Sequence, residues 1–188
     1  MSELFSIQLQ NRQQQGRDGI WLDLPTTTEQ VQAALRQIGI SSDNPQGLFI
    51  SGYFAEEEKR FAIPYNMVLA SNVDELNFLA ARLETLSAGE RAELNAALQT
   101  PQSEFSSIGR ITDFPENVEY YVYLPDVRGP AQLGDYYLNR SGMVNMPEEW
   151  KGGIDTAQFG RYVAQQEQGA FTQYGYLVKS GDEWQKVH

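Results

Sequence analysis

Apolar side chains recur with two spacings along the chain, and each spacing predicts a different kind of element. Ile7 and Leu9 alternate with polar neighbours, as in a strand that buries one face. The segment 19–25, which is stopped by Pro25, and the segment 47–54 have the composition of two further strands. The first part of the chain therefore predicts three short strands.

A helical spacing appears three times before the aromatic-rich last part of the chain. The first helix is expected after a capping box formed by Thr26 and Glu29, in which each side chain binds the other's backbone N–H. The other two occupy 72–86, with Asn72 as the N-cap, and 87–100, which stops before a proline. Leucine and alanine repeat every three or four positions in both, so each helix should bury one face.

The last part of the chain is rich in aromatic residues and mixes short elements of both types. We expect a strand over 117–124, a short helix over 130–139, a helix over 155–167 and a closing strand over 171–178. The 155–167 helix should bury the face that carries Phe159, Tyr162, Val163 and Gln166. Because the strands and helices do not alternate regularly, the pattern predicts an α+β fold.

These patterns divide the chain into three segments, which we predict to be three small domains. Residues 1–62 are mixed α and β, residues 63–108 are helical, and residues 109–188 are again mixed. With 188 residues, the chain is long enough for this number of small domains.

Charge is the strongest compositional signal. The chain has 25 acidic and 14 basic residues, and its formal net charge is −11. Such a protein is repelled by nucleic acid and attracted to basic surfaces, although solubility alone also explains an acidic composition. Cysteine is absent, and neither a secretory signal nor a membrane span is visible, so we expect a cytoplasmic protein without disulfides.

Several enzyme classes are excluded by the residues that are missing. The single histidine is His188, at a position where an imidazole is rarely held still for triad or zinc chemistry. No phosphate-binding glycine loop or Gly-x-Ser-x-Gly motif is present, and we expect no cofactor and no metal. A hydrolase with paired carboxylates stays open, with Trp21, Trp150 and Trp184 as possible sugar-stacking residues. A generic acidic interaction module for another basic DNA-binding protein also stays open.

Four stretches in order along the chain carry a family resemblance. Residues 19–25 form Gly-x-Trp-x-x-Leu-Pro, and residues 73–80 contain Glu-Leu-Asn-x-Leu-Ala at the start of the leucine-rich helix. Residues 133–137 read Leu-Gly-Asp-Tyr-Tyr. A Gly-Arg pair within 159–162 is then followed by Gly-x-Phe-x-x-x-Gly-Tyr over 169–176. Together these stretches resemble the ArdA family, the antirestriction proteins of mobile genetic elements.

The resemblance implies a fold and a function. It implies an elongated protein of three small domains that pairs into a curved homodimer, with acidic side chains placed where duplex phosphates would lie. It implies a non-enzymatic DNA mimic whose partner is the type I restriction–modification enzyme, especially its methyltransferase core, and which does not itself bind nucleic acid. Restriction is then blocked, and modification is a further possible target.

The charge density of DNA sets how long such a mimic is. Duplex DNA carries one charge per ~1.7 Å of axis, so the carboxylates of one chain correspond to roughly 40 Å of duplex and the net charge to about half of that. A dimer reaches farther, provided that lysine and arginine lie off the mimicking face. Dimerisation is therefore part of the predicted mechanism.

The candidate residues follow from this reading. The acidic side chains expected on the mimicking surface are Asp74, Glu75, Glu84, Glu90, Glu93, Glu104, Asp113, Glu116, Glu119, Asp126 and Asp135. The apolar, β-prone stretch expected at the dimer interface, for which core burial is an equal alternative, comprises Tyr120, Tyr121, Val122, Tyr123 and Leu124. Helix capping also explains Asp74, Glu75 and Glu90, so we expect many small effects rather than one dominant residue.

Overall fold

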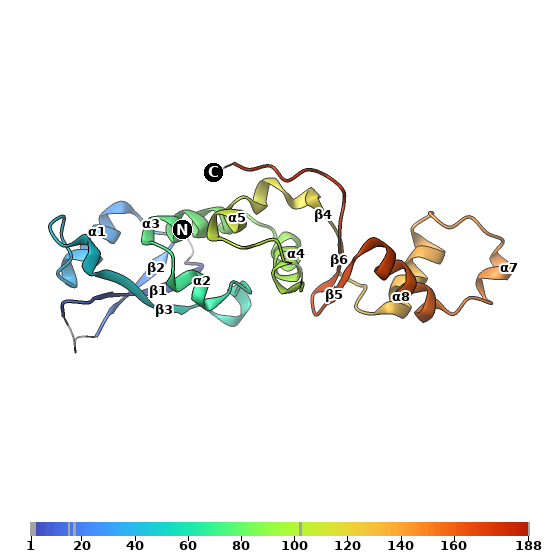
Figure 1. Cartoon of the computed structure of the whole chain (residues 1–188), viewed down its shortest axis with the longest axis horizontal. Helices are drawn as coiled ribbons and strands as arrows, with labels where there is room; N and C mark the ends of the chain where they lie inside the picture. Colours follow the sequence, from blue (N-terminus) through green and yellow to red (C-terminus); the bar gives the residue numbers. More distant parts are fainter. Residues whose placement is uncertain (1–2, 15, 17, 102, 188) are drawn as a thin grey trace. The chain divides into compact units, whose positions relative to one another are not determined.

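The computed structural model describes residues 3–14, 16, 18–101 and 103–187, and Figure 1 shows its elements. The chain forms two compact units: unit 1 comprises Met1–Ser87, Phe105–Pro115 and Lys186–His188, and unit 2 comprises Ala88–Glu104 and Glu116–Gln185. The α+β prediction is confirmed, because the described residues contain two three-stranded antiparallel sheets and eight α-helices. The division into three domains at 62 and 108 stays a prediction, and His188 lies outside the described residues.

Unit 1 is a sheet covered by short helices. Its main elements are β1 (Phe5–Asn11), β2 (Ile20–Leu24), α1 (Thr28–Gln37), β3 (Leu48–Phe54), α2 (Tyr65–Leu69), α3 (Val73–Glu84) and α5 (Ile108–Thr112), with short 3-10 turns at Pro45–Gly47 and Glu57–Lys59. The sheet order is β2-β1-β3, with both pairs antiparallel. The alternation of Ile7 and Leu9 predicted this central strand correctly, since both are fully buried.

The capping box of α1 lies one residue later than predicted. Thr27 is the N-cap: its side chain accepts from the Gln30 N–H at 3.3 Å, and Gln30 accepts from the Thr27 N–H at 3.3 Å. Thr26 is held instead by Asn77 of α3, whose side chain accepts from the Thr26 N–H at 2.7 Å and donates to its carbonyl at 3.0 Å. This contact delays the helix by one residue and explains the asparagine of the Glu-Leu-Asn motif.

The predicted start of α3 is confirmed, and its leucine face forms the core of unit 1. The side chain of Asn72 accepts from the Glu75 N–H at 2.9 Å. Leu76, Leu79 and Leu83 are fully buried. The 3.6-residue repeat therefore identified both the helix and the face that packs.

Unit 2 contains the second sheet and the remaining helices. Its elements are α4 (Ala88–Gln99), a 3-10 turn at Val118–Tyr120, β4 (Tyr121–Leu124), α6 (Pro130–Asp135), a π-helical turn at Tyr136–Arg140, α7 (Glu148–Lys151), α8 (Thr156–Glu167), β5 (Ala170–Thr172) and β6 (Gly175–Lys179). A 3-10 turn at Phe114–Glu116 lies where the chain passes from unit 1 to unit 2. The sheet order is β4-β6-β5, with both pairs antiparallel.

The prediction of one closing strand over 171–178 is wrong, because this stretch is a hairpin of β5 and β6. Thr172 Oγ1 accepts from the backbone N–H of Tyr174 at 3.1 Å and of Gly175 at 3.2 Å, which closes the turn. Gly175 has φ +147°, and a Cβ there would lie 2.5 Å from the Leu124 carbonyl oxygen, so glycine is required. The turn was not predicted because the stretch is mostly apolar and aromatic, and Gly175 is the one residue in it that is typical of a turn.

The buried face of α8 also differs from the prediction. It is centred on Gly160 and Ala164, whereas Tyr162 is 60% exposed. A Cβ on Gly160 would lie 1.8 Å from the Pro130 carbonyl oxygen, and one on Gly134 would lie 1.9 Å from that of Thr156. Helices α6 and α8 thus cross in backbone contact, a packing that selects small residues and overrides the aromatic periodicity.

Candidate functional site

The acidic residues of α3 lie at its two ends. Asp74 and Glu75 occupy the first turn, where the helix dipole favours negative charge, and Asp74 is exposed. Glu84 is the last residue of the helix and is half-buried. Capping accounts for the first two positions, and the exposure of Asp74 leaves its carboxylate accessible to a partner.

Glu93 of α4 does not present a negative charge at neutral pH. Burial, together with a smaller effect of the nearby charge of Glu90, raises the pKa of its carboxyl to about 8. Its Oε1 atom is buried without a hydrogen-bond partner among the described residues. A carboxyl in this setting keeps its proton, so the predicted place of Glu93 on a mimicking surface has no electrostatic support.

Three further predicted acids are occupied by contacts within their own unit. Asp113 is only 2% exposed and accepts from the Val187 N–H at 3.3 Å. Glu104 pairs with Lys179 and accepts from the Tyr120 hydroxyl at 2.8 Å, and its hydrogen bond raises the pKa of Lys179. Asp135 pairs with Arg140 at 3.3 Å. These carboxylates are therefore largely compensated by their neighbours.

A group of four exposed acids surrounds one open hollow of unit 2, with a volume of about 620 Å³. Glu116 and Glu119 contribute from the segment before β4, and Asp182 and Glu183 from the segment after β6; all four are exposed. The hollow is also lined by Asn117, Val118, Tyr120, Trp184 and Gln185, and no lysine or arginine belongs to this lining. We call it the acidic hollow.

Sequence reasoning found half of the acidic hollow. Glu116 and Glu119 were predicted, whereas Asp182 and Glu183 were not, since they lie in an extended segment without any periodicity. The only local signal was the pair of adjacent acids beside Trp184. Asp126, which was predicted, is exposed in the turn that follows β4.

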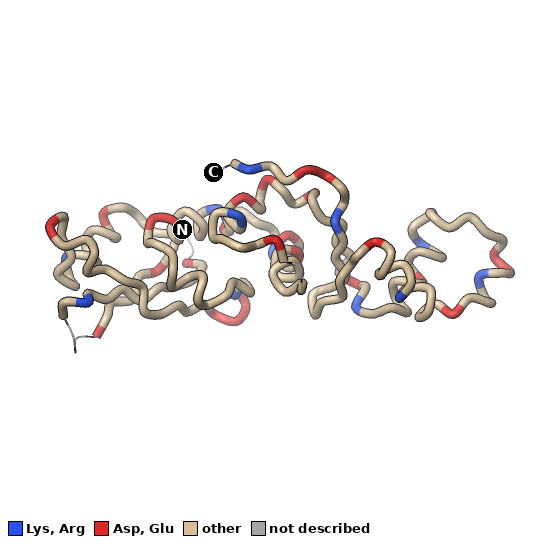
Figure 2. The backbone as a smooth tube through the Cα atoms, viewed as in Figure 1, with Lys and Arg blue, Asp and Glu red and all other residues tan. Residues whose placement is uncertain are grey.

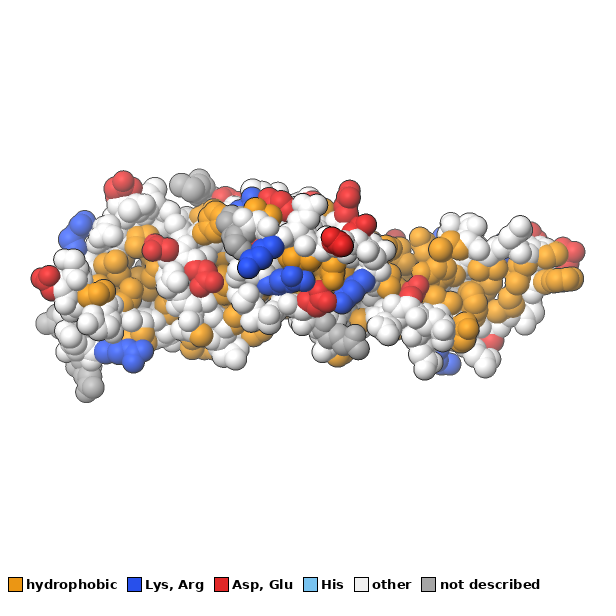
Figure 3. All heavy atoms as spheres, turned by 45° about the horizontal axis from the view of Figure 1, so that its top comes forward, with side chains coloured by type: hydrophobic (Ala, Val, Ile, Leu, Met, Phe, Trp, Pro, Cys, Tyr) orange, Lys and Arg blue, Asp and Glu red, His pale blue; other side chains and the backbone are white. Residues whose placement is uncertain are grey.

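Basic residues are interspersed with acidic ones elsewhere, as Figure 2 shows along the backbone. Unit 2 has 13 acidic and six basic residues, whereas unit 1 has 12 and eight, so the formal net charges are −7 and −4. The face in Figure 3 likewise carries both signs of charge. A hollow of unit 1 lined by Glu56, Glu57 and Glu58 also lacks a basic side chain in its lining, but Glu56 there pairs with Lys59 at 3.3 Å. The acidic hollow differs from it in bringing together acids from two segments that are distant in the sequence.

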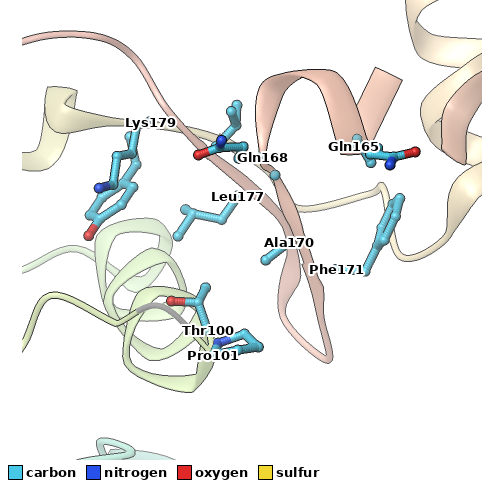
Figure 4. A pocket seen from close by; sticks show the side chains of 12 residues that line it. Thr100, Pro101, Gln165, Gln168, Ala170, Phe171, Leu177 and Lys179 are labelled. Atoms are coloured by element: carbon cyan, nitrogen blue, oxygen red, sulfur yellow. The ribbon is translucent and has the colours of Figure 1, made fainter. Parts of the chain in front are cut away.

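A second hollow of unit 2, of about 490 Å³, is mostly apolar (Figure 4). Thr100 and Pro101 face Ala170, Phe171 and Leu177 across it, and no carboxylate lines it. Among the described residues, no group of three or more histidine, aspartate and glutamate side chains could hold a metal ion. The apolar hollow therefore lacks the paired carboxylates of the hydrolase alternative.

The segment predicted at the dimer interface forms the edge strand β4. It is paired with β6 on one side, with the register Val122 to Val178. The strand itself begins at Tyr121, because Tyr120 belongs to the preceding 3-10 turn. Val122 is 44% exposed, whereas Tyr123 and Leu124 are half-buried. Both predicted uses of the segment, packing and association, are thus compatible with its geometry.

Comparison with known proteins identifies the chain. No helix within the described residues has the length and apolar character required to cross a membrane. No curated protein matches the sequence. Residues 15–178 match the family described as Antirestriction protein (ArdA), whose members are non-enzymatic DNA mimics that inhibit type I restriction enzymes. The match covers most of the chain, which therefore belongs to the ArdA family of antirestriction proteins.

Proposed function

We propose that the chain acts as a homodimer on the methyltransferase core of its type I restriction–modification target, with the acidic hollow as the principal contact on each protomer. The observation that carries this proposal is the lining of that hollow, to which two segments distant in the sequence contribute four exposed acidic residues. A groove rich in lysine and arginine, which normally binds phosphates, is complementary to such a surface. Because the target is an intracellular enzyme, we place the protein in the cytoplasm.

The proposed mimicking surface is narrower than the sequence suggests. Its exposed members in unit 2 are Glu116, Glu119, Asp126, Asp182 and Glu183, and in unit 1 the exposed candidate is Asp74. Glu75, Glu84 and Glu90 are half-buried and contribute less. We leave out Glu93 and Asp113 because burial removes the charge of the first and the accessibility of the second.

A folded mimic has an energetic advantage over DNA in the same groove. Bending a duplex onto a protein requires work, on the order of 1–6 kcal/mol for a bend of 40–90° over 20–30 base pairs. A protein surface that already has its final form avoids this deformation. The attraction is electrostatic, so added salt should weaken the complex.

We propose that the edge strand β4 forms the dimer contact. Val122 presents an apolar side chain at a strand whose outer edge has no partner strand among the described residues. Pairing of this edge with its twin across a two-fold axis would bury that side chain and satisfy the backbone groups of the edge. A dimer also doubles the number of acids presented to the target.

Competition against DNA tests the proposal. Purified type I methyltransferase core, bound to a labelled duplex, is titrated with the chain at several salt concentrations. We expect displacement of DNA, with an inhibition constant that rises with salt. A chain that binds with an affinity independent of salt, or that leaves the DNA bound, would contradict the mechanism.

A matched pair of variants locates the contact. The variant E116Q/E119Q/D182N/E183Q removes four carboxylates from the acidic hollow. The control D43N/E56Q/E57Q/E58Q removes four exposed carboxylates from unit 1. We expect the first to weaken inhibition at least about tenfold more than the second, on the basis of a few tenths of a kcal/mol per exposed ion pair. Equal losses would mean that total charge, and not the acidic hollow, governs binding.

A further inference from the structure

The segment after β6 is attached to unit 2 through one side chain that uses both of its polar groups. Asn117, only 4% exposed, accepts from the Gln185 N–H at 2.7 Å and donates to the Gln185 carbonyl at 2.8 Å. This two-point contact resembles a pair of ladder bonds between strands, with a side chain in place of one strand. Residues 180–185 contain no helix or strand in the described structure, so such contacts determine the path of the chain.

Two further contacts hold the same segment against the residues before β4. The Ser180 N–H donates to the Tyr120 carbonyl at 3.0 Å, and the Ser180 hydroxyl donates to Asp182 within the same segment at 2.9 Å. The Trp184 ring meets the Tyr120 ring edge to face, with centroids 5.1 Å apart. Residues 180–185, which we call the strap, are thus fixed at both ends to the segment 117–120.

The family match ends at residue 178, just before the strap begins. The strap nevertheless supplies Asp182 and Glu183, half of the carboxylates that line the acidic hollow. The other half, Glu116 and Glu119, flank Asn117 in sequence. The side chain that binds the strap therefore belongs to the segment that supplies the other two acids.

We infer that Asn117 is a positioning residue for inhibition: by binding the strap at Gln185, it sets the spacing of the carboxylates that receive basic side chains of the target. This inference rests on the proposed function, since it assigns a geometry to the same contact surface. Asn117 is only 4% exposed, and its side chain is engaged with the backbone of Gln185. Its effect is to prevent the four acids from separating into two independent, mobile groups, for which ordering on binding would oppose association.

The experiment compares three variants of the full chain. N117A removes both hydrogen bonds to the strap and leaves every carboxylate in place. D182N/E183Q removes the charges of the strap and leaves its attachment intact. N145A replaces an exposed asparagine of the loop before α7 and serves as the control. Hydrogen exchange of the Gln185 amide reports strap attachment, and inhibition of the methyltransferase core is measured across a salt series.

We expect the Gln185 amide of N117A to exchange much faster than in the wild type, and its inhibition constant to rise about tenfold at low salt. The dependence of that constant on salt should also become shallower, as in D182N/E183Q, because fewer charge contacts form together. A loss of folded protein alone would raise the inhibition constant by the same factor at every salt concentration and leave the slope unchanged.

Two results would overturn the inference. One is a protected Gln185 amide in N117A, which would mean that Asn117 does not hold the strap. The other is a released strap with inhibition and salt dependence equal to those of N145A. If the wild-type chain fails to inhibit at any salt concentration, it is the proposed function that fails, whatever the exchange data show.

Discussion

Glu93 provides a quantitative test of how burial limits the charge of this protein. Its pKa is raised from 4.5 to about 8, mainly by burial and then by Glu90. The folded state therefore keeps a proton that the unfolded chain releases, and the stability of the fold falls as the pH rises from about 4.5 to about 8. Below that window both states are protonated, and Glu93 makes no pH-dependent contribution.

The substitution E93Q removes this titration while preserving the shape of the side chain. One pKa unit corresponds to about 1.4 kcal/mol. Between pH 5 and pH 8, the contribution of Glu93 to the free energy of unfolding can therefore change by at most roughly 3.5 kcal/mol. Because Glu93 is only half-buried, solvent reduces this value, and we expect about 1–2 kcal/mol. The free energy of unfolding of E93Q, measured relative to that of the wild type, should therefore be higher at pH 8 than at pH 5 by this amount.

The assay is denaturant unfolding at both pH values, with E119Q as the control for an exposed carboxylate. Using the difference between two pH values removes any constant effect of the new amide. At pH 7, E93Q should inhibit the methyltransferase as well as the wild type, because a neutral carboxyl is replaced by a neutral amide. If E93Q gained no stability with pH, or lost more inhibition than E119Q, the carboxyl of Glu93 would have to be charged.

Three other predictions concern the packing and association of unit 2. G160A places a methyl group against the Pro130 carbonyl, so thermal unfolding should show a loss of about 1–3 kcal/mol in the free energy of unfolding. G152A, where the added methyl group meets open space, should be as stable as the wild type. Y176F removes a buried hydroxyl that Glu167 accepts from, and denaturant unfolding should show a loss of about 1–3 kcal/mol that the exposed Y162F does not share. V122D should convert the dimer to monomers in sedimentation equilibrium, whereas V187D, at a valine of similar exposure, should not; a dimeric V122D would remove β4 from the interface.

The elements that the sequence predicted well are those in which one face alone packs. The alternation around Ile7 and the leucine repeat of α3 both match the buried positions of the structure. Periodicity fails in unit 2, where α6 and α8 meet through glycines. There the aromatic residues of α8 point partly to solvent, and the packing face is marked by the smallest residues instead of the largest. Close backbone approach leaves no apolar signal for a periodic pattern to detect.

The motifs that carried the family resemblance have structural roles in these contacts. Asn77 of the helix motif binds the backbone of Thr26, and Gly134 and Gly160 form the helix crossing. Gly169 is packed against Tyr176, since a Cβ there would lie 1.8 Å from the tyrosine hydroxyl oxygen. These positions identify the fold, whereas the four acids of the acidic hollow lie outside the stretches that carried the resemblance.

The sequence gives the number of acidic residues, but it does not show which of them are ionised and accessible in the folded protein. Glu93 and Glu119 both stand between hydrophobic neighbours in the sequence, yet the first keeps its proton at neutral pH and the second is exposed. Glu104 and Asp135 have basic partners that are 75 and five residues away in the chain, and only the folded structure brings the distant one close. The number of carboxylates available to a basic groove is therefore smaller than the 25 acidic residues of the sequence. A mimic of this kind depends on the placement of a few accessible carboxylates, which is why the attachment of the strap at Asn117 should affect inhibition even when no charge is removed.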